Sequence, residues 1–374
     1  MQTELKRRMP IGAEVLENGV HFRVWAPKRK QVSVKLRESG ELIPLESEGN
    51  GHFIAFCEGI GDGARYSFRL DDDDYDYPDP ASRFQPDGVH AASQVVDPES
   101  YRWNDGDWRG VELPGQVIYE MHIGCFTDAG TWKSAESKLP FLAETGITML
   151  EVMPVADFDG QFGWGYDGVK WYAPTRLYGS PNDFRHFVDT AHQLGLAVIL
   201  DVVYNHFGPT GNYTGAFSPH FVSQRHPTEW GDAINYDGEQ AAGVREFVTE
   251  NAAYWIREFH LDGLRLDATQ TIYDDSPRHL LADLSTAARA AAFTASGEQR
   301  KIVLMKLRKF DMSKASIKTA SAWTDYGTMI FITLAASPQP GMPNTTTPIM
   351  RGRHKNLSRR PAGDTCSRVN TRMN

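Results

Sequence analysis

The chain has 374 residues, of which 41% are hydrophobic, 23% are charged and 11% are aromatic. This is the composition of a globular protein with a large core and room for two or three domains. The net charge of −9 argues against nucleic acid as the main partner. The three cysteines (Cys57, Cys125 and Cys366) are far apart and predict neither a disulfide framework nor a metal site.

The chain carries no targeting or membrane signal. Residues 1–10 contain charges but lack the apolar stretch of a signal peptide, and no run of eighteen apolar residues occurs anywhere. We therefore expect a cytoplasmic protein that makes no contact with a membrane.

The first part of the chain has the pattern of short antiparallel strands. Apolar residues alternate with polar ones at Val20, Phe22 and Val24, and the pattern repeats from Val32 to Leu36. This predicts a small antiparallel β-sandwich over residues 1–75. Residues 25–27 and 66–69 resemble the immunoglobulin-like sandwich, similar to a carbohydrate-binding module, that precedes the barrel in branching and debranching members of the α-amylase family. Of two interpretations, sugar binding or packing against the next domain, the second is favoured.

Residues 76–115 are rich in Pro, Asp and Gly, and they contain Tyr101, Trp103 and Trp108. This composition indicates a linker that is anchored by its aromatic side chains and packs on both neighbours.

Strand and helix patterns alternate after the linker. Strands are predicted at residues 117–123, 147–153, 196–206, 264–267 and 302–304, and helices at 132–144, 184–194 and 244–259. Such alternation predicts a parallel sheet covered by helices. By itself it does not separate a barrel from an open sheet.

Polar residues gather at the ends of the predicted strands. His122 ends the first, and Asp201, Asn205 and His206 end the third, after a continuous apolar run typical of a strand buried on both faces. The other members of this group are Trp164, Tyr166 and Asp167 after the second strand, and Arg265 and Asp267 in the fourth. Because parallel strands end at the same rim, these side chains are expected to lie together.

Arg265 and Asp267 are two residues apart, so both side chains point to the same face of a strand. Buried charges are rarely tolerated unless they are paired or used. An arginine beside a carboxylate keeps it ionised, which suits a carboxylate nucleophile.

The segments 196–206 and 261–269 resemble the first two signature regions of the α-amylase family of glycoside hydrolases. The resemblance implies a (β/α)8 TIM barrel over residues 116–304, incomplete and reaching about strand five. It implies that Asp267 is the nucleophile of a retaining glycosidase, that Arg265 orients it, and that Asp201 and Asn205 hold the strand end in shape. His122, Trp164, Tyr166, Asp167 and His206 would then bind the sugar. No cofactor or metal is implied, and calcium at Asp201 and Asn205 is the less favoured alternative.

Four loops, at residues 154–168, 173–179, 205–213 and 228–235, resemble the trehalose-releasing members of this family. The implied partners are maltooligosyltrehalose or maltodextrin as substrate and, as a functional link, a maltooligosyltrehalose synthase. The alternatives are a glucanotransferase similar to glycogen branching enzyme and a glucan-binding remnant without activity. Trehalose, a new branch point, or binding with neither product would distinguish the three.

The final segment differs from the rest of the chain. From Gly297 onward there are fourteen Lys or Arg and four Asp or Glu, a balance of +10, so residues 1–296 carry −19. The interpretation of residues 305–374 as an aberrant, disordered basic tail is favoured over a nucleic-acid-binding tail. A retaining glycosidase needs two carboxyl groups about 5–5.5 Å apart. Glu298, the nearest glutamate, precedes the fifth strand, so neither a general acid nor a third carboxylate is matched, and we expect an unstable, inactive chain.

We predict a frameshift near Leu304. The family carries a downstream Trp-Asn-Asp-Asp-Phe-His-His segment, whose codons read one base late can spell residues 327–333 of this chain. The codons of Met305 and Lys306 are ATG followed by AAA or AAG. Read one base earlier, they contain GAA, a glutamate codon, just after the expected fifth strand, where the family places its general acid. Sequencing the DNA across codons 300–310 tests this, and an alternative frame without barrel-like text would contradict it.

Overall fold

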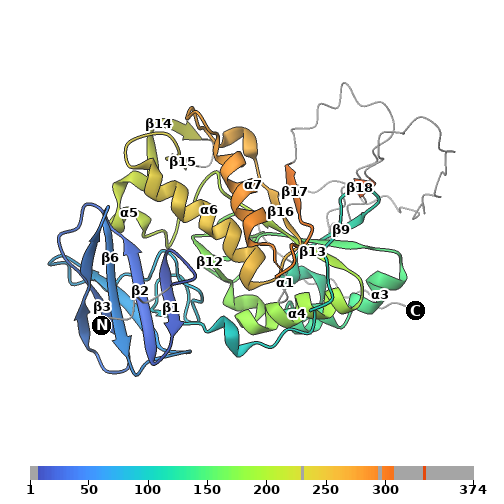
Figure 1. Ribbon diagram of the computed structural model, residues 1–374, viewed down its shortest axis with the longest axis horizontal. Coiled ribbons are helices and arrows are strands. Elements are labelled where there is room, and N and C mark those ends of the chain that lie inside the picture. The colour runs from blue at the N-terminus through green and yellow to red at the C-terminus, as the bar shows by residue number, and fades with distance from the viewer. Residues whose placement is uncertain (1–6, 229–230, 294–296, 307–331, 334–374) are drawn as a thin grey trace, which may run out of the picture. The chain divides into compact units, whose positions relative to one another are not determined.

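The computed structural model describes residues 7–228, 231–293, 297–306 and 332–333 (Figure 1). The predicted tail, residues 305–374, lies outside the described residues except for 305–306 and 332–333. Within the described part, no helix has the length and apolar character needed to cross a membrane.

The N-terminal part is a β-sandwich, as predicted. One antiparallel sheet has the order β1-β2-β6-β5 and the other has the order β4-β3-β7-β8 (blue strands in Figure 1). Val20, Phe22, Val34 and Phe68 are fully buried between them. The strands are β1 Gly12–Leu16, β2 Gly19–Trp25, β3 Val32–Leu36, β4 Leu42–Pro44, β5 Glu46–Gly49, β6 His52–Glu58, β7 Arg65–Leu70 and β8 Ser93–Gln94.

The segment predicted as a linker is partly built into the sandwich. β8 pairs with β7, and Tyr77 forms a bridge with Phe68. A strand of two residues, such as β8, is too short to be recognised from the sequence. The domain boundaries at 75 and 115 stay predictions.

The second part contains a parallel sheet in the order β17-β16-β13-β10-β9, which matches the first five strands of the expected barrel. The short strand β18 pairs antiparallel with the free side of β9. The strands are β9 Val117–Met121, β10 Met149–Val152, β13 Ala197–Val202, β16 Gly263–Leu266, β17 Val303–Lys306 and β18 Ile332–Thr333.

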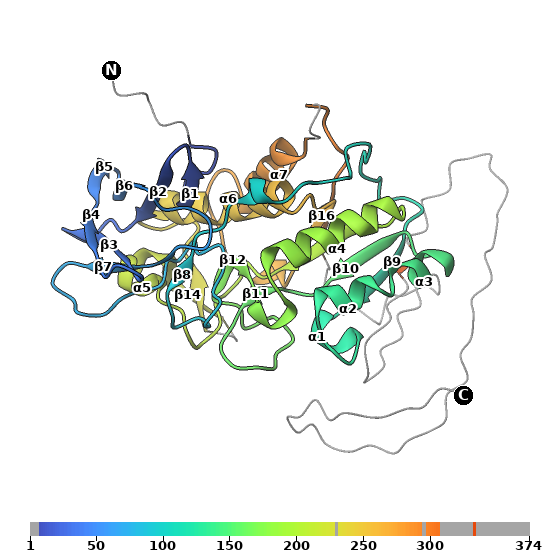
Figure 2. The same cartoon turned by 90° about the horizontal axis from the view of Figure 1, so that it is seen from below.

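Helices α4, α6 and α7 follow β10, β13 and β16 in the chain (Figures 1 and 2). The helices are α1 Ile123–Phe126, α2 Trp132–Glu136, α3 Leu139–Glu144, α4 Pro181–Gln193, α5 Thr214–Phe217, α6 Ala241–Glu258 and α7 Leu280–Ala291. Two small hairpins complete the fold: β11 Ala156–Asp157 with β12 Lys170–Pro174, and β14 Val222–Thr228 with β15 Gly231–Ile234.

The predicted helix over residues 132–144 is two helices. The first, α2, ends at Glu136, and Pro140 occupies the first turn of α3. Proline lacks an N–H group and its ring collides with the carbonyl group four residues earlier, so one continuous helix is disfavoured. The prediction of a single helix was therefore wrong.

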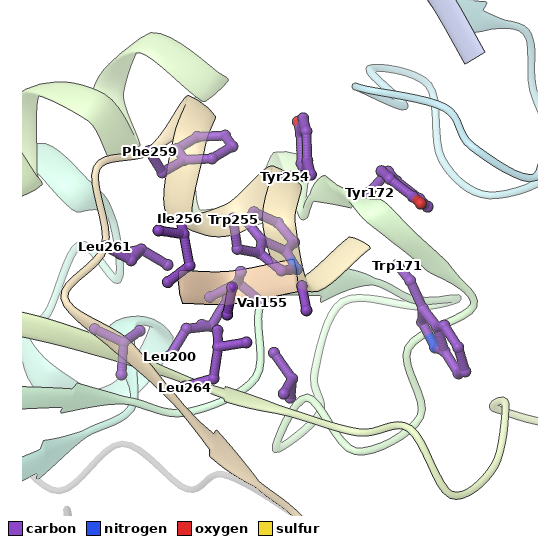
Figure 3. Close-up of a cluster of buried hydrophobic side chains, with 14 of the residues drawn as sticks. Val155, Trp171, Tyr172, Leu200, Tyr254, Trp255, Ile256, Phe259, Leu261 and Leu264 are labelled. Atoms are coloured by element: carbon purple, nitrogen blue, oxygen red, sulfur yellow. The ribbon is translucent and has the colours of Figure 1, made fainter. Parts of the chain in front are cut away.

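The two faces of the parallel sheet differ. On one face Leu200 and Leu264 pack under Trp255 and Ile256 of α6 in a large apolar core (Figure 3). On the other face lies a smaller apolar cluster formed by Ile118, Met149, Ala197, Ile199, Val303 and Met305, with Trp108, Val111 and Leu113 packed against it. This second face is the interior of a barrel, and its charged layer forms the site described below.

The aromatic residues before β9 fasten that segment to the α/β unit. Trp103 stacks on His260 at 3.7 Å between ring centroids, and Trp108 stacks on His192 at 4.7 Å. The indole N–H of Trp108 also donates to the fully buried carboxylate of Asp262 at 2.7 Å.

We predict that Trp108→Phe lowers the free energy of unfolding by about 1–3 kcal/mol, because a buried carboxylate loses a donor while the ring stacking is kept. Urea denaturation followed by circular dichroism measures the change. Trp164→Phe, at a tryptophan that is 57% exposed, is the matched control. Equal losses in the two variants would contradict the prediction.

Candidate active site

The site is built at the carboxyl end of the parallel sheet, where the predicted residues converge. Asp201 of β13 and Arg265 of β16 are direct partners in the strand register. Asp267 follows one residue after β16 ends. Adjacent strands therefore bring two carboxylates and a guanidinium to the same level.

Arg265 joins both carboxylates through one nitrogen. Its Nη1 lies 2.8 Å from both carboxylate oxygens of Asp201 and 2.7 Å from Oδ1 of Asp267. Burial opposes the charge of Arg265, but the charge of Asp201 and the hydrogen bond to it raise the pKa of Arg265 above its ordinary value. Charge-assisted bonds of this kind are short and strong.

Asp267 is the more accessible of the two carboxylates. Its side chain is 20% exposed, whereas that of Asp201 is fully buried. The amide of Asn205 donates to Oδ2 of Asp267 at 3.1 Å, so both oxygens of this carboxylate are held. The following residue, Ala268, has φ of +37°, a left-handed conformation that non-glycine residues rarely adopt.

Asp201 is held from a second side by the loop after β10. The hydroxyl group of Tyr166 donates to Oδ2 of Asp201 at 2.9 Å. Burial raises the pKa of Asp201 to about 7, although Arg265 acts in the opposite direction. With its two oxygens on Arg265 and Tyr166, Asp201 acts as a fixed partner of the arginine.

His206 completes this group. Its Nδ1 contacts Oδ1 of Asn205, and its ring is 7% exposed. Burial lowers the pKa of His206, while a hydrogen bond to the backbone of Tyr166 opposes the shift. The imidazole is therefore neutral at pH 7 and can both donate and accept a hydrogen bond.

His122 and Trp164 form a second group beside the first. Nε2 of His122 lies 2.9 Å from the carbonyl oxygen of Gly163 and 3.0 Å from the hydroxyl group of Tyr178. The Trp164 ring meets the His122 ring edge-on, with centroids 5.2 Å apart. Burial lowers the pKa of His122, so this ring is also neutral at pH 7.

One loop, residues 158–168, connects the two groups, since Gly163 contacts His122 and Tyr166 contacts Asp201. A Cβ on Gly208 would lie 1.9 Å from the carbonyl oxygen of Asp167, so the loop after β13 packs directly on this one. The side chain of Asp167 is exposed, and its charge reaches His206. The other eight predicted residues each contact another member of the group through their side chains.

Two glutamates beneath the site, the buried Glu151 and the partly buried Glu120, were not identified in the sequence. Glu151 of β10 is 3% exposed, and its Oε1 lies 3.8 Å from Nε of Arg265. Its register partner on β9 is Glu120. The sequence did contain a signal for Glu151, because it is the single carboxylate in the otherwise apolar strand Met149–Val152. Burial raises the pKa of Glu151 to about 8, helped by Asp201 and Glu120 and opposed by Arg265.

A possible cation position lies elsewhere in the described residues. Ligand atoms of His226, Asp237 and Asp275 are within 4.8 Å of one another. The guanidinium of Arg225 already pairs with Asp237 at 2.5 Å. Since a side chain supplies the positive charge there, we assign no metal to this group.

Glu298 lies before β17, where its Oε2 pairs with Nε of Arg109 at 3.1 Å. It is therefore not at the end of the sheet that carries Asp267. The residues after Lys306 that would continue the strand end lie outside the described part.

We predict that Glu151→Gln removes part of the pH dependence of stability. The folded protein holds a proton on Glu151 up to about pH 8, whereas the unfolded chain releases it near 4.5. The free energy of unfolding of the original chain therefore falls as pH rises through this window, by up to about 1.4 kcal/mol per pH unit from this group. Urea denaturation between pH 5 and 8 measures the slope in both proteins.

Glu144→Gln, at an exposed glutamate of α3, is the control and should keep the original slope. Burial also raises the pKa of Asp201 and of Asp157, and both groups are present in both proteins. The difference between the two slopes therefore isolates the contribution of Glu151. Parallel profiles for Glu151→Gln and the original chain would contradict the assignment.

Two family models match the chain. Residues 10–87 match carbohydrate-binding module 48, the isoamylase N-terminal domain, and residues 94–230 match the alpha amylase catalytic domain. These matches agree with the sandwich and with the first part of the barrel.

Curated relatives share a high identity over three quarters of the chain. The malto-oligosyltrehalose trehalohydrolase of Saccharolobus solfataricus is 46% identical over 74% of this chain and 49% of its own length. That of Deinococcus radiodurans is 45% identical over 76% of this chain and 46% of its own length. The chain thus spans about half the length of the curated relatives it matches.

Solved structures give the same result. A putative alpha amylase from Salmonella typhimurium superposes with a TM-score of 0.74 and 43% identity, over 80% of this chain and 49% of that one. A pullulanase from Anoxybacillus sp. LM18-11, complexed with maltotriose, has a TM-score of 0.67 at 21% identity, over 79% and 48%, which shows the fold alone. The chain therefore carries an isoamylase-type N-terminal domain at residues 10–87 and the first part of an alpha amylase catalytic domain at residues 94–230, and it is similar to about half the length of the malto-oligosyltrehalose trehalohydrolases.

Proposed function

We propose that this site belongs to a retaining hydrolase that cuts the α-1,4-glucosidic bond next to the trehalosyl end of maltooligosyltrehalose and releases trehalose. The observation that carries the proposal is the carboxylate of Asp267. Its Oδ1 accepts a hydrogen bond from Nη1 of Arg265 at 2.7 Å, and its Oδ2 accepts one from the amide of Asn205 at 3.1 Å. The side chain is nevertheless 20% exposed. A nucleophile must be ionised, oriented and open to its substrate.

The first step would proceed at Asp267. A carboxylate oxygen attacks the anomeric carbon, the bond to the leaving oxygen breaks, and a general acid gives that oxygen a proton. A water molecule then attacks the anomeric carbon and gives its proton to the former general acid, which now acts as a base, while Asp267 leaves as a carboxylate. Arg265 would orient the carboxylate of Asp267 before the attack and pair with it again when it leaves in the second step.

The surrounding residues would bind the sugar. The neutral ring of His206 is suited to the hydroxyl groups of a glucosyl residue, and Tyr166 offers an aromatic face beside Asp201. Trp164, exposed and next to His122, offers a further stacking surface at the rim. Asp201, Asn205 and Asp167 would position these groups. The substrate would come from a maltooligosyltrehalose synthase.

The general acid is the missing component. By resemblance to the family, a glutamate is expected just after the predicted strand 302–304, and this chain has Met305 and Lys306 there, at the end of β17. The nearest glutamate, Glu298, pairs with Arg109 before the strand. We therefore infer that the chain binds its glucan without cutting it and supplies the nucleophile half of the site.

A glucanotransferase is the second candidate. The 1,4-alpha-glucan branching enzyme of Thermosynechococcus vestitus is 33% identical over 70% of this chain and 41% of its own length. The two functions share the covalent step and differ in the acceptor, water or a glucan hydroxyl group. A new α-1,6 branch in place of trehalose would favour this candidate.

We predict that residues 1–304, joined to the corresponding C-terminal part of the Deinococcus radiodurans relative, release trehalose from maltooligosyltrehalose, while the chain alone releases none. Asp267→Ala in the joined protein should lower the rate at least about 1000-fold, since the covalent route is lost. Chromatography of the products measures both.

Added azide should restore turnover of Asp267→Ala and yield a glycosyl azide of inverted configuration, because the small anion occupies the vacated position of the carboxylate. Asp107→Ala, at an exposed aspartate before β9 and outside the site, is the matched control and should keep most of the activity. Trehalose release by the chain alone, or an active Asp267→Ala without azide, would overturn the proposal.

A further inference from the structure

A cluster of aromatic side chains outside the Asp267 site is not used by the proposed chemistry. It consists of Tyr75 and Tyr77, which follow β7, of Tyr213 in the loop after β13, and of His90. Ring centroids lie 4.7 Å apart for Tyr75 and Tyr77, 5.6 Å for Tyr75 and Tyr213, and 5.8 Å for His90 and Tyr213. Three separate segments of the chain thus assemble one aromatic surface, which we call the tyrosine cluster.

The tyrosine cluster is supported from beneath. Phe217 of α5 is fully buried and lies 6.1 Å from the ring of Tyr77. The ammonium group of Lys170, a residue 1% exposed, lies 5.3 Å from the centroid of the Tyr213 ring. Burial lowers the pKa of Lys170 to about 7, so its amine contacts the ring partly as a cation. The position of Tyr213 is therefore set by the core, while Tyr75 remains 41% exposed.

A polar rim adjoins the exposed rings. The hydroxyl groups of Tyr75 and Tyr213 are hydrogen bonded at 2.7 Å, and Nδ1 of His90 lies 2.7 Å from the hydroxyl group of Tyr213. Nε2 of His90 lies 3.6 Å from Oδ1 of Asp159, and both of these side chains are half exposed. Flat rings beside a row of donors and acceptors match the two kinds of surface on a glucose residue, its C–H face and its hydroxyl groups.

The tyrosine cluster and its rim share two loops with the candidate active site. Asp159 lies in the same loop, residues 158–168, that carries Trp164 and Tyr166. In addition, Tyr213 follows Asn205 and His206 in the loop after β13. The two loops that carry residues of the candidate active site thus also carry Tyr213 and Asp159, the partner of His90.

The alternative is that these tyrosines only join the sandwich to the α/β unit. Other aromatic pairs already do this from buried positions: Trp25 with Phe221 at 5.4 Å, and Phe68 with Phe217 at 6.0 Å. A joint needs neither the exposure of Tyr75 nor paired hydroxyl groups at the surface. The rim and the exposed ring favour a ligand.

We propose that the tyrosine cluster is a second glucan-binding subsite, which holds a remote part of an α-1,4-glucan chain through Tyr75 and Tyr213. This deepens the proposed function, on which it rests for the identity of the ligand. It assigns sugar binding to the surface beside the sandwich, where packing alone was the favoured interpretation of the sequence.

Maltoheptaose and the full chain provide the test. Hydrogen exchange should show protection of peptides that cover residues 73–78 and 211–215 when maltoheptaose is added, and none with the β-1,4-linked cellohexaose. The double variant Tyr75→Ala, Tyr213→Ala should raise the dissociation constant for maltoheptaose about tenfold, measured by calorimetry.

Two further variants separate binding from folding. Phe141→Ala, at a 63% exposed aromatic residue of α3, should bind as the original chain does. Tyr75→Phe keeps the ring and loses one hydroxyl group, so it should fold normally and show a smaller loss of affinity than the double variant.

Asp267→Asn should keep the protection at residues 73–78 and 211–215, so failure of the hydrolytic proposal leaves this subsite testable. Protection confined to residues 158–168 and 201–206 would overturn the proposal. So would unchanged affinity in a folded double variant.

Discussion

The site depends on one guanidinium group shared between two carboxylates. Arg265 holds the buried Asp201 through both carboxylate oxygens and the partly exposed Asp267 through one. Removing ions from water costs several kcal/mol for each, and only good geometry offsets this cost. Tyr166 fixes Asp201 by a hydrogen bond, and Asp201 in turn fixes the guanidinium of Arg265. Arg265 then holds the carboxylate of Asp267 in place.

The two buried acids near Arg265, Glu151 and Asp201, have raised pKa values, and the balance of charge around them explains why. Glu151 and Asp201 lie around a single positive group, and burial raises the pKa of both. One guanidinium does not compensate several buried carboxylates, so protons make up the difference. The interior of the half barrel therefore has Glu151 as a buried, protonated acid below Arg265 and the partly exposed side chain of Asp267 at the rim.

Loops extend this arrangement over a wider surface. Residues 158–168 contact His122 on one side and Asp201 on the other, and Asp159 in the same loop reaches His90. The loop after β13 carries both His206 and Tyr213. Two loops thus link the carboxylate at Asp267 to the tyrosine cluster, which gives a polymeric substrate more than one place of contact.

The sequence by itself determined the sandwich, the five parallel strands and the rim on which the polar residues gather, because these follow from local periodicity and from the direction of each strand. It also indicated the pairing of Arg265 with Asp267, which depends on a spacing of two residues. Only the tertiary structure decided that Asp201 is the principal partner of Arg265, that Glu151 lies beneath it, and that Tyr75, His90 and Tyr213 meet. Those contacts join residues 64 to 138 positions apart, or join strands through their register, and no local pattern specifies such a distance.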